Sequence, residues 1–332
     1  MKALILAPFS SPALEKLRAE LEVAYESWLD SRRLYSPEEL AERLSGEDIA
    51  ILVVEADFVF EETFEQAPRL KFLGVCRGNP NNVDVDAATR HGVLVAHTPG
   101  RNAPAVAEMA LALMLCLARR IPPAHQMVAS GAWEDPTEPY ISLRGLELGG
   151  KTLGLVGLGA IGAELARRAS ALGMKVLAHD PYVQPAQAQG TGVALVDMET
   201  LLRQSDFLSL HCPATDVTRG LIDKERLALM KPSAYLINTA DAALIDEEAL
   251  ADFLKKGRLA GAGLDVFPSH PVAPDNPLLG LDNVVLTPHI GGATQETIAR
   301  HSEMIAEDIL HFLRGERPAH LLNPQAWGQH GH

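Results

Sequence analysis

Short apolar runs alternate with amphipathic stretches in the first part of the chain. The apolar runs are residues 3–7, 49–54, 72–76 and 93–96. Between them, stretches such as 12–21 and 37–44 carry apolar residues at helical spacing. Buried strands that alternate with helices form a parallel sheet covered on both faces. The pattern therefore predicts a small open α/β domain over residues 1–100.

A strong helix and a second α/β segment follow this domain. The helix begins near Asn102, a favourable capping residue, and repeats apolar side chains from Val106 to Leu117. Further strands are expected at residues 152–156, 175–179, 207–211, 234–238, 259–266 and 284–287. Helices are expected at 160–172, 198–204, 223–230 and 246–256, and a terminal amphipathic helix over 294–313. This order predicts a larger, doubly wound α/β domain.

Chain length and composition agree with two globular domains. The chain has 332 residues, of which 47% are apolar and 22% are charged. Its 29 Lys and Arg residues against 43 Asp and Glu residues give a net charge of −14. Because phosphate binding needs clustered positive charge, neither nucleic acid nor a membrane surface is an expected partner. A negatively charged substrate would need a locally positive pocket.

Cysteine usage and the length of the apolar runs indicate the compartment. Cys76, Cys116 and Cys212 are widely spaced, and they match neither a disulfide framework nor the spacing of zinc ligands. The longest apolar run, residues 109–118, is well short of the roughly 20 residues that a membrane span needs. A cytoplasmic protein without a membrane span is therefore expected.

A glycine-rich turn at residues 157–162 lies between an expected strand and an expected helix. In this context Gly157 permits a tight turn, Gly159 allows close approach of a pyrophosphate, and Gly162 allows helix and strand to pack closely. The pyrophosphate would bind at the helix N-terminus. Asp180 ends the next expected strand, where a carboxylate binds the ribose hydroxyls and repels a 2′-phosphate. The sequence predicts an NAD site rather than an NADP site.

Ligands of open α/β sheets bind outside the carboxyl ends of the strands. The residues that follow the expected strands of the second domain are His211 with Cys212, residues 239–241, Asp265 and residues 288–292. Arg77 of the first domain is expected to face them across a cleft. His289 lies between a proline and two glycines, which predicts an exposed imidazole on a rigid turn. An imidazole there is suited to remove an alcohol proton during hydride transfer to NAD.

Several motifs resemble those of the D-isomer-specific 2-hydroxyacid dehydrogenase family. They are residues 157–162 with Asp180, KPSAYLINTA (231–240), GLDVF (263–267) and LTPHIGG (286–292), preceded by NVD (82–84) and VAE (106–108). The match spans nearly the whole chain in the order of the family. It implies an NAD-dependent oxidoreductase that acts on the CH–OH group of a small 2-hydroxy acid or a related substrate.

The resemblance also implies a domain plan and a set of binding residues. A Rossmann NAD-binding domain over residues 101–291 would be inserted into a flavodoxin-like substrate-binding domain formed by residues 1–100 and 292–332, with homodimers built through the NAD-binding domain. The implied substrate residues are Arg77, Gly78, Asn79 and Arg101. The implied cofactor residues are Val106, Gly157, Gly159, Ala160, Ile161, Gly162, Asp180, His211, Cys212, Pro213, Thr239, Ala240, Asp265, His289, Gly291 and Gly292.

Two active-site positions depart from the family pattern. Asp241 stands where the family has the Arg that holds the substrate carboxylate, and His270 stands where it has the Glu that supports the catalytic imidazole. Two unit charges about 4 Å apart interact by about 4 kcal/mol at an effective dielectric near 20, so the reversed charge should weaken binding of a simple 2-hydroxy acid. Three compensations are open: a clamp by Arg77 or Arg101, pairing of Asp241 with His270, or a substrate that presents a hydroxyl or a cation.

These changes leave three interpretations of the site. In the first, Asp241, His270 and His289 form a rearranged catalytic cluster in which His289 transfers the proton. In the second, the chain binds NAD without turnover and acts as a sensor or partner-binding protein. In the third, one carboxylate and two histidines bind a metal such as Fe(II) or Zn. The first interpretation is preferred, and no metal is expected.

Overall fold

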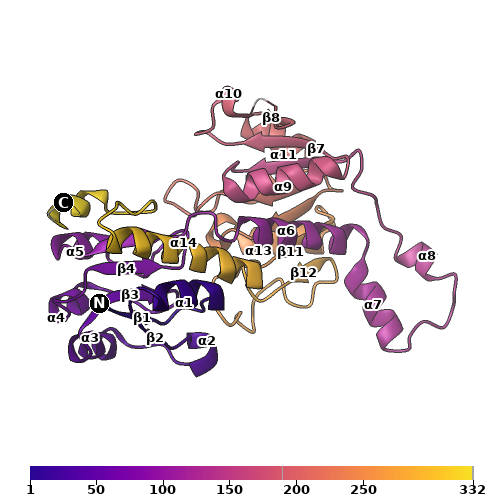
Figure 1. The fold of residues 1–332 in the computed structure, drawn as a ribbon. Coiled ribbons are helices and arrows are strands. Elements are labelled where there is room, and N and C mark those ends of the chain that lie inside the picture. The colour runs from indigo at the N-terminus through magenta and orange to yellow at the C-terminus, as the bar shows by residue number, and fades with distance from the viewer. Residues whose placement is uncertain (189, 331–332) are drawn as a thin grey trace. The chain divides into compact units, whose positions relative to one another are not determined.

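The computed structural model describes residues 1–188 and 190–330. The chain divides into two compact units, and many of their elements are labelled in Figure 1. Unit 1 consists of Met1–Arg101 and Thr294–His332, and unit 2 of Asn102–Ala293. The expected boundaries, after residues 100 and 291, lie one and two residues earlier. Residues 331–332, part of the expected substrate-binding domain, are outside the described residues.

The described part of unit 1 contains a five-stranded sheet with the order β2-β1-β3-β4-β5, in which all neighbouring strands are parallel. This is the flavodoxin-like order. The strands are β1 (Lys2–Ile5), β2 (Glu22–Tyr25), β3 (Ile49–Val54), β4 (Phe72–Val75) and β5 (Leu94–His97). The helices are α1 (Ser11–Arg18), α2 (Trp28–Ser31), α3 (Pro37–Gly46), α4 (Glu61–Gln66), α5 (Val85–Arg90), α14 (Gln295–Leu313) and the 3-10 helix η2 (Pro324–His330). The predicted parallel α/β architecture is confirmed.

Helices cover both faces of this sheet because side chains alternate along each strand. Leu4 packs with residues of α3, α4 and α5, whereas Ile5 packs with residues of α1 and α14. The C-terminal helix α14 lies so close to β4 that a Cβ on Gly74 would be 2.8 Å from the Ile305 side chain. The last α-helix of the described residues is therefore part of the core of unit 1.

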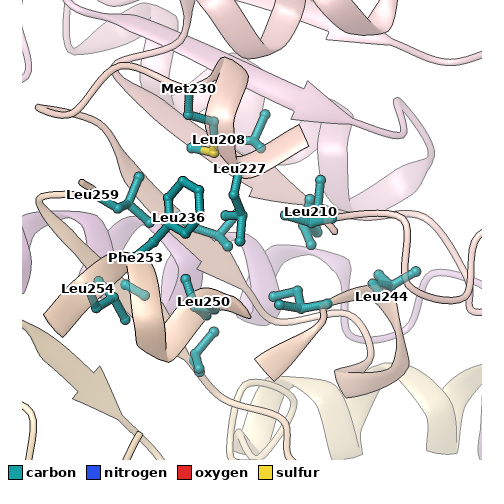
Figure 2. Packing of buried hydrophobic residues seen from close by; sticks show 14 of the residues in the cluster. Leu208, Leu210, Leu227, Met230, Leu236, Leu244, Leu250, Phe253, Leu254 and Leu259 are labelled. Atoms are coloured by element: carbon teal, nitrogen blue, oxygen red, sulfur yellow. The ribbon is translucent and has the colours of Figure 1, made fainter. Parts of the chain in front are cut away.

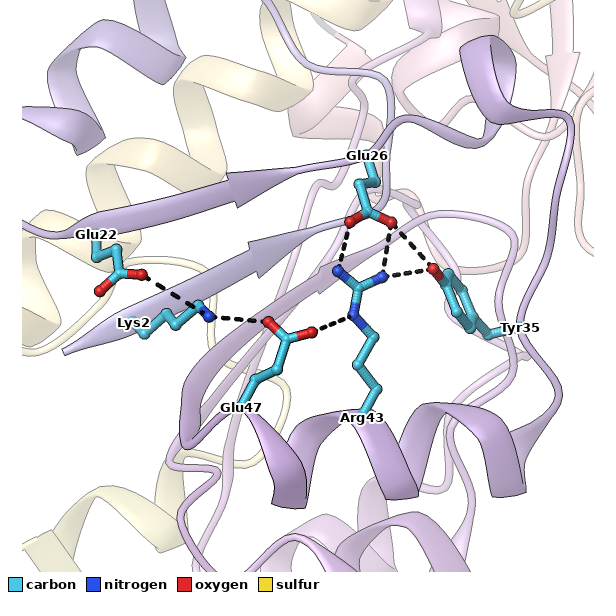
Figure 3. Close-up of polar contacts among 6 residues, drawn as sticks. All are labelled: Lys2, Glu22, Glu26, Tyr35, Arg43 and Glu47. Carbon is cyan, nitrogen blue, oxygen red and sulfur yellow. Dashed lines mark hydrogen bonds and ion pairs between the residues drawn. The ribbon is translucent and has the colours of Figure 1, made fainter.

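The edge strand β2 is missing from the sequence prediction. Its four residues are only partly buried or exposed, so no apolar run marks it. A polar network joins β1, β2 and α3 at this edge (Figure 3). Arg43 donates to Glu26 at 2.6 Å and to Glu47 at 3.0 Å, and Lys2 donates to Glu47 at 2.8 Å. The Arg43 guanidinium lowers the pKa of Glu26, which means that the network favours the ionised carboxylate.

Within its described residues, unit 2 has a seven-stranded parallel sheet with the order β12-β11-β10-β9-β6-β7-β8. The order reverses at β6, which neighbours both β7 and β9, as in a Rossmann sheet. The strands are β6 (Thr152–Val156), β7 (Lys175–His179), β8 (Val193–Leu195), β9 (Phe207–Leu210), β10 (Tyr235–Asn238), β11 (Gly261–Leu264) and β12 (Val284–Leu286). The doubly wound architecture is confirmed. Only the three-residue edge strand β8 was not predicted.

Two helical layers cover the sheet of unit 2. Residues of α6 and α9 form the core on one face, and residues of α11, α12 and α13 form the core on the other, where Leu236, Leu250 and Phe253 are buried together (Figure 2). The helices are α6 (Ala103–Ala118), α7 (Ile121–Ala129), α8 (Pro139–Ser142), α9 (Ala160–Ala171), α10 (Pro185–Ala188), α11 (Met198–Gln204), α12 (Lys224–Leu229), the 3-10 helix η1 (Ala242–Leu244) and α13 (Glu247–Lys255). Across residues 1–188 and 190–330, no helix combines the length and apolarity that a bilayer span requires.

One expected cap is wrong in detail. Asn102 occupies the N-cap position of α6, but its side chain makes no capping hydrogen bond. Its amide lies instead against Gly292, where an added Cβ would be 3.4 Å from the Asn102 Nδ2 atom. The helix therefore starts at the expected place, while the side chain of Asn102 packs against the turn after His289.

Candidate functional site

The glycine-rich turn of unit 2 joins β6 to α9. Gly157 has a φ of +95°, and a Cβ there would lie 2.9 Å from the His211 carbonyl group. A Cβ on Gly162 would lie 2.3 Å from the carbonyl oxygen of Gly157. Both positions therefore require glycine for geometric reasons. Gly159 differs, because nothing lies within 4 Å of a Cβ added there and Gly159 itself is exposed.

This open space lies at the N-terminus of α9. Gly159 is the N-cap residue, no side chain caps the helix, and Ala160 and Ile161 form its first turn. Unpaired N–H groups at a helix start attract anions. The turn therefore has the shape and the donors that a pyrophosphate needs.

Asp180 follows β7 and is held by the same turn. Its Oδ2 atom accepts a hydrogen bond from the Leu158 N–H at 2.8 Å, and its Oδ1 atom accepts one from the Tyr182 N–H at 2.9 Å. A carboxylate has further lone pairs beyond these two bonds. Asp180 is thus oriented beside the turn with acceptor capacity left for ribose hydroxyls.

Two buried polar atoms near the ends of β9 and β10 have no hydrogen-bond partner among the described residues. They are His211 Nδ1 and Thr239 Oγ1. The other ring nitrogen of His211 lies 2.9 Å from Ser209 Oγ, and burial lowers the pKa of His211 to about 4, so the ring is neutral at pH 7. Buried polar groups are rarely left unpaired, which suits a site that a ligand completes. Together with the open Gly159, these atoms fit a bound dinucleotide.

The neighbouring cofactor candidates lie in the same part of unit 2. Cys212 and Pro213 follow His211, and burial raises the pKa of the Cys212 thiol. Ala240 follows Thr239, and its N–H donates to Asn238 Oδ1 at 3.0 Å. Val106 is buried on α6.

Asp241 lies in the turn after β10, where its carboxylate caps η1. Its Oδ1 atom accepts from the Ala243 N–H at 2.8 Å, and its carbonyl oxygen accepts from Asn238 Nδ2 at 2.7 Å. It lines a cavity of about 480 Å³ in which the charged lining residues are Asp241, Asp246, Glu247, Glu248 and Arg219. Since four of these are acidic and one is basic, this wall disfavours an anion.

Asp265 organises the turn that carries His289. Only 1% of Asp265 is exposed. Its Oδ1 atom accepts from Thr287 Oγ1 at 2.6 Å and from the Ile290 N–H at 2.9 Å, and its Oδ2 atom accepts from the Gly291 N–H at 2.7 Å. Three donors on one buried carboxylate fix the turn on both sides of residues 288–289. Asp265 therefore holds the turn that the sequence predicted to be rigid.

His289 projects from this turn and meets His270. It is exposed, with a left-handed backbone at φ +56°. Its Nδ1 atom lies 3.0 Å from Nε2 of His270, with the ring centroids 5.0 Å apart. His270 belongs to the loop between the buried residues Phe267 and Leu278. Two of the three expected catalytic side chains are therefore in contact.

The third expected side chain does not join this pair. Among the described residues, the hydrogen bonds of the Asp241 carboxylate go to Ala243 and to neither histidine. The described residues also contain no group of three His, Cys, Asp or Glu side chains that could hold a metal ion. Of the predicted three-residue cluster, only the two histidines are hydrogen bonded to each other, and the Asp241 carboxylate is bonded within its own turn.

The substrate candidates of unit 1 follow β4 and β5. The half-buried Arg77 donates to Asn81 Oδ1 at 3.1 Å, and burial lowers the pKa of its guanidinium. Asn79 is exposed, and the Gly78 carbonyl lies 2.9 Å from His97 Nδ1. Arg77 therefore lies at the carboxyl end of the sheet and is hydrogen bonded there to a neutral side chain.

The Arg101 guanidinium contacts two other side chains of unit 1. Its guanidinium pairs with Glu55 at 2.7 Å and lies 2.6 Å from Nδ1 of His301, which is fully buried. Nε2 of His301 lies 2.7 Å from the Pro8 carbonyl, so that nitrogen carries the hydrogen. Burial lowers the pKa of His301 to about 4, which keeps the ring neutral. Arg101 is consequently held rigidly by a carboxylate and an imidazole.

Sequence reasoning missed the residues that support the candidates. Ser209 contacts His211, Asn238 shapes residues 239–241, and Glu55 with His301 holds Arg101. A signal exists for some of them. Ser209 and Asn238 are polar residues inside apolar strands, and His301 interrupts the apolar face of the terminal helix. Glu55 directly follows the run 49–54, which is the place where ligand-side residues are expected.

Unit 2 has the sheet order, the glycine turn and the acidic strand end of a dinucleotide-binding oxidoreductase domain. The family model described as "D-isomer specific 2-hydroxyacid dehydrogenase, NAD binding domain" matches residues 111–291. The chain belongs to the D-isomer specific 2-hydroxyacid dehydrogenase family. The resemblance inferred from the motifs is thereby confirmed.

Similar proteins extend over almost the whole chain. D-3-phosphoglycerate dehydrogenase of Archaeoglobus fulgidus is 41% identical over 316 residues, which are 95% of this chain and 58% of that protein. Glyoxylate reductase of Korarchaeum cryptofilum is 42% identical over 276 residues, 83% of each chain. The solved TT0316 protein of Thermus thermophilus has a TM-score of 0.84 at 38% identity, covering 97% of this chain and 100% of its own. The chain thus spans less than two thirds of the phosphoglycerate dehydrogenase.

Proposed function

We propose that this protein is an NAD-dependent oxidoreductase that acts on the CH–OH group of a small 2-hydroxy acid or a related hydroxylated substrate, with His289 as the proton-transfer group. The observation that carries the proposal is the His289 imidazole, exposed on a turn that Asp265 holds at three points. The names of the relatives, a phosphoglycerate dehydrogenase and a glyoxylate reductase, support an activity of this class.

The proposed binding of NAD uses the residues of unit 2. The turn at Gly157, Gly159 and Gly162 would hold the pyrophosphate, and Asp180 would accept hydrogen bonds from the ribose hydroxyls. His211 Nδ1 and Thr239 Oγ1 are buried atoms that a ligand could pair. Asp180 also disfavours a 2′-phosphate, because two negative groups would be adjacent, which supports NAD over NADP.

When bound, NAD supplies the acceptor for the hydride of the alcohol carbon. The chain's own contribution is the transfer of the hydroxyl proton. Nε2 of His289 is the ring nitrogen that is free of His270, so it is the atom that would take this proton in oxidation and return it in reduction. Asp265 holds the turn that carries the imidazole through Thr287, Ile290 and Gly291, and it does not react.

The proposed anchor for an acidic substrate is on unit 1. Asp241 stands where the family pattern has a cation, and the cavity it lines is mostly acidic, so it would repel a carboxylate. Arg77 offers a half-buried guanidinium without a carboxylate partner among the described residues, beside Gly78 and Asn79. Arg101 adds positive charge but is already paired with Glu55. Asp241 is suited to accept hydrogen bonds from hydroxyl groups rather than to bind a carboxylate.

Turnover of a defined panel tests this proposal. The purified protein is mixed with NADH and glyoxylate or hydroxypyruvate, and with NAD and 2-hydroxy acids, sugar acids or polyols, while NADH absorbance is followed. We expect turnover of at least one hydroxylated acid, and calorimetric binding of NAD that is tighter than that of NADP. Tight binding of NAD without turnover of any panel member would favour a non-catalytic NAD-binding protein. Failure to bind either nucleotide would contradict both functions.

We also propose that the protein forms a homodimer through residues 119–147 of unit 2. Helices α7 and α8 of this segment contain no buried residue. Their apolar side chains are exposed, Val128 by 61%, Tyr140 by 80% and Ile141 by 77%. Exposed apolar patches of this kind mark protein interfaces. A second copy of the chain fits the family resemblance, which implies dimers built through this domain.

Charged substitutions in this segment should separate the dimer. In the double variant Tyr140→Glu and Ile141→Glu, we expect the mass measured by light scattering at micromolar concentration to fall from that of two chains to that of one, because the interface would bury two carboxylates. Val217→Glu is the matched control, since Val217 is 87% exposed and lies outside the segment. A wild-type protein with the mass of one chain would contradict the proposal.

A further inference from the structure

The contact between His270 and His289 limits the hydrogens that the pair can carry. Nδ1 of His289 and Nε2 of His270 are 3.0 Å apart, the distance of a hydrogen bond. Such a bond needs one hydrogen between the two nitrogens and one lone pair to accept it. If both nitrogens carried a hydrogen, the bond would be lost. The two facing nitrogens, Nδ1 of His289 and Nε2 of His270, therefore carry one hydrogen between them.

Other groups near the turn do not supply an alternative partner. His270 is the one side chain hydrogen bonded to the His289 ring among residues 1–188 and 190–330. Asp265, the carboxylate closest in the turn, is committed to Thr287, Ile290 and Gly291. Asp241 is bonded to Ala243. Among the described residues, His270 is thus the side chain that can fix the tautomer of His289.

We infer that His270 is a positioning residue that holds His289 in the tautomer with the hydrogen on Nδ1 and a bare Nε2. In this arrangement Nδ1–H of His289 donates to Nε2 of His270, whose own ring hydrogen is on Nδ1. The inference rests on the proposed function, because only a bare Nε2 can take the alcohol proton. The reverse arrangement, with His270 donating, would place a hydrogen on Nε2 of His289 and remove the base.

The arrangement also accounts for the proton during turnover. In oxidation the alcohol O–H bond breaks and its proton forms a bond to Nε2 of His289, and the C–H bond of the same carbon breaks, its hydride going to the acceptor that bound NAD would supply. His289 then carries both hydrogens and one positive charge, and the Nδ1–H bond to His270 persists and becomes charge-assisted. Neither ring has to rotate, and no hydrogen has to move between the two rings, when His289 passes from its neutral to its charged state. A neutral imidazole thus does the orienting work for which the family pattern has a carboxylate.

Two substitutions of His270 separate the hydrogen-bond role from a packing role. In His270→Gln the side-chain oxygen can still accept from Nδ1–H, whereas in His270→Phe a ring of similar size remains but the acceptor is gone. The full chain is labelled with ¹⁵N-histidine, and the ring nitrogens of His289 are assigned by comparison with His289→Asn. Long-range ¹H–¹⁵N spectra at neutral pH then report which nitrogen of His289 carries the hydrogen. Free histidine in the same buffer serves as the reference for averaged tautomers.

We expect the wild type and His270→Gln to show Nδ1 protonated and Nε2 bare. In His270→Phe we expect the averaged tautomers of free histidine. With a substrate that turns over, His270→Phe should lower kcat by roughly tenfold or more without changing KM for NAD, and His270→Gln should retain most of it. A wild-type spectrum with averaged tautomers, or with the hydrogen on Nε2, would overturn the inference.

The outcomes distinguish this inference from the proposed function. If His289→Ala abolishes turnover but His270→Phe leaves both the tautomer and kcat as in the wild type, the inference fails and the proposed function stands. If His289→Ala keeps full turnover, the proposed function fails whatever the spectra show.

Discussion

His289→Ala is expected to lower kcat by roughly 10²- to 10⁴-fold, which is the usual contribution of a general base. The variant removes the imidazole but keeps the backbone of the turn, which Asp265 holds through Thr287, Ile290 and Gly291. NAD affinity measured by calorimetry should therefore change little. Steady-state kinetics on a substrate identified in the panel provides the measurement.

Two comparisons make this result specific. His91→Ala removes an exposed imidazole of unit 1 that is hydrogen bonded to Glu61, and it should keep the kcat of the wild type. The backbone of residue 289 is left-handed, with a φ of +56°, and alanine is no better suited to this conformation than histidine. The substitution therefore relieves no backbone strain, and the unfolding temperature should stay close to that of the wild type. Wild-type kcat in His289→Ala would remove His289 from the mechanism.

Gly159→Val is expected to abolish tight NAD binding without destabilising the fold. Nothing lies within 4 Å of a Cβ at Gly159, and its φ of −72° is accessible to any residue, so valine has room in the unliganded protein. The added side chain would occupy the space in which the pyrophosphate approaches the start of α9. We expect the dissociation constant to rise at least about 100-fold, or about 2.7 kcal/mol, while the melting temperature falls by no more than about 4 °C.

Two other glycines serve as controls for this variant. Gly162→Ala places a Cβ 2.3 Å from the Gly157 carbonyl oxygen, so both stability and NAD binding should fall. Gly46→Ala, at the end of α3 in unit 1, meets nothing within 4 Å and should change neither. If Gly159→Val bound NAD as the wild type does, the pyrophosphate would have to bind elsewhere, and the proposed cofactor site would be wrong.

Most of the fold could be predicted from the sequence, because buried parallel strands are apolar along their whole length. The runs at 49–54 and 152–156 coincide with β3 and β6. The two edge strands that were missed show the limit of this signal. Glu22–Tyr25 is exposed or partly buried, and β8 has three residues, so neither presents a continuous apolar run. Edge strands are recognised by their pairing, which a sequence pattern does not contain.

In the candidate site too, some contacts could be predicted from the sequence and others could not. The Gly157 turn and Asp180 are close in the sequence and belong to one β-α-β unit, so their proximity follows from local order. His270 lies in the loop after β11 and His289 in the turn after β12, and the sequence does not fix the 3.0 Å distance between their ring nitrogens. Asp241 was grouped with them because of its position in a family motif. Its bond to the Ala243 N–H, made within its own turn, orients its carboxylate instead.

The place of α14 in the core of unit 1 has a consequence for synthesis of the chain. Ile305, Ile309 and Phe312 cover one face of the sheet formed by residues from β1 to β5. During translation only α1 is present to cover that face while the whole of residues 102–293 is added, although amino-terminal segments usually fold first. Unit 2, being continuous, completes its own core earlier. The domain that is made first is therefore the one that matures last, and the part of its apolar face that α14 covers needs protection in the interval.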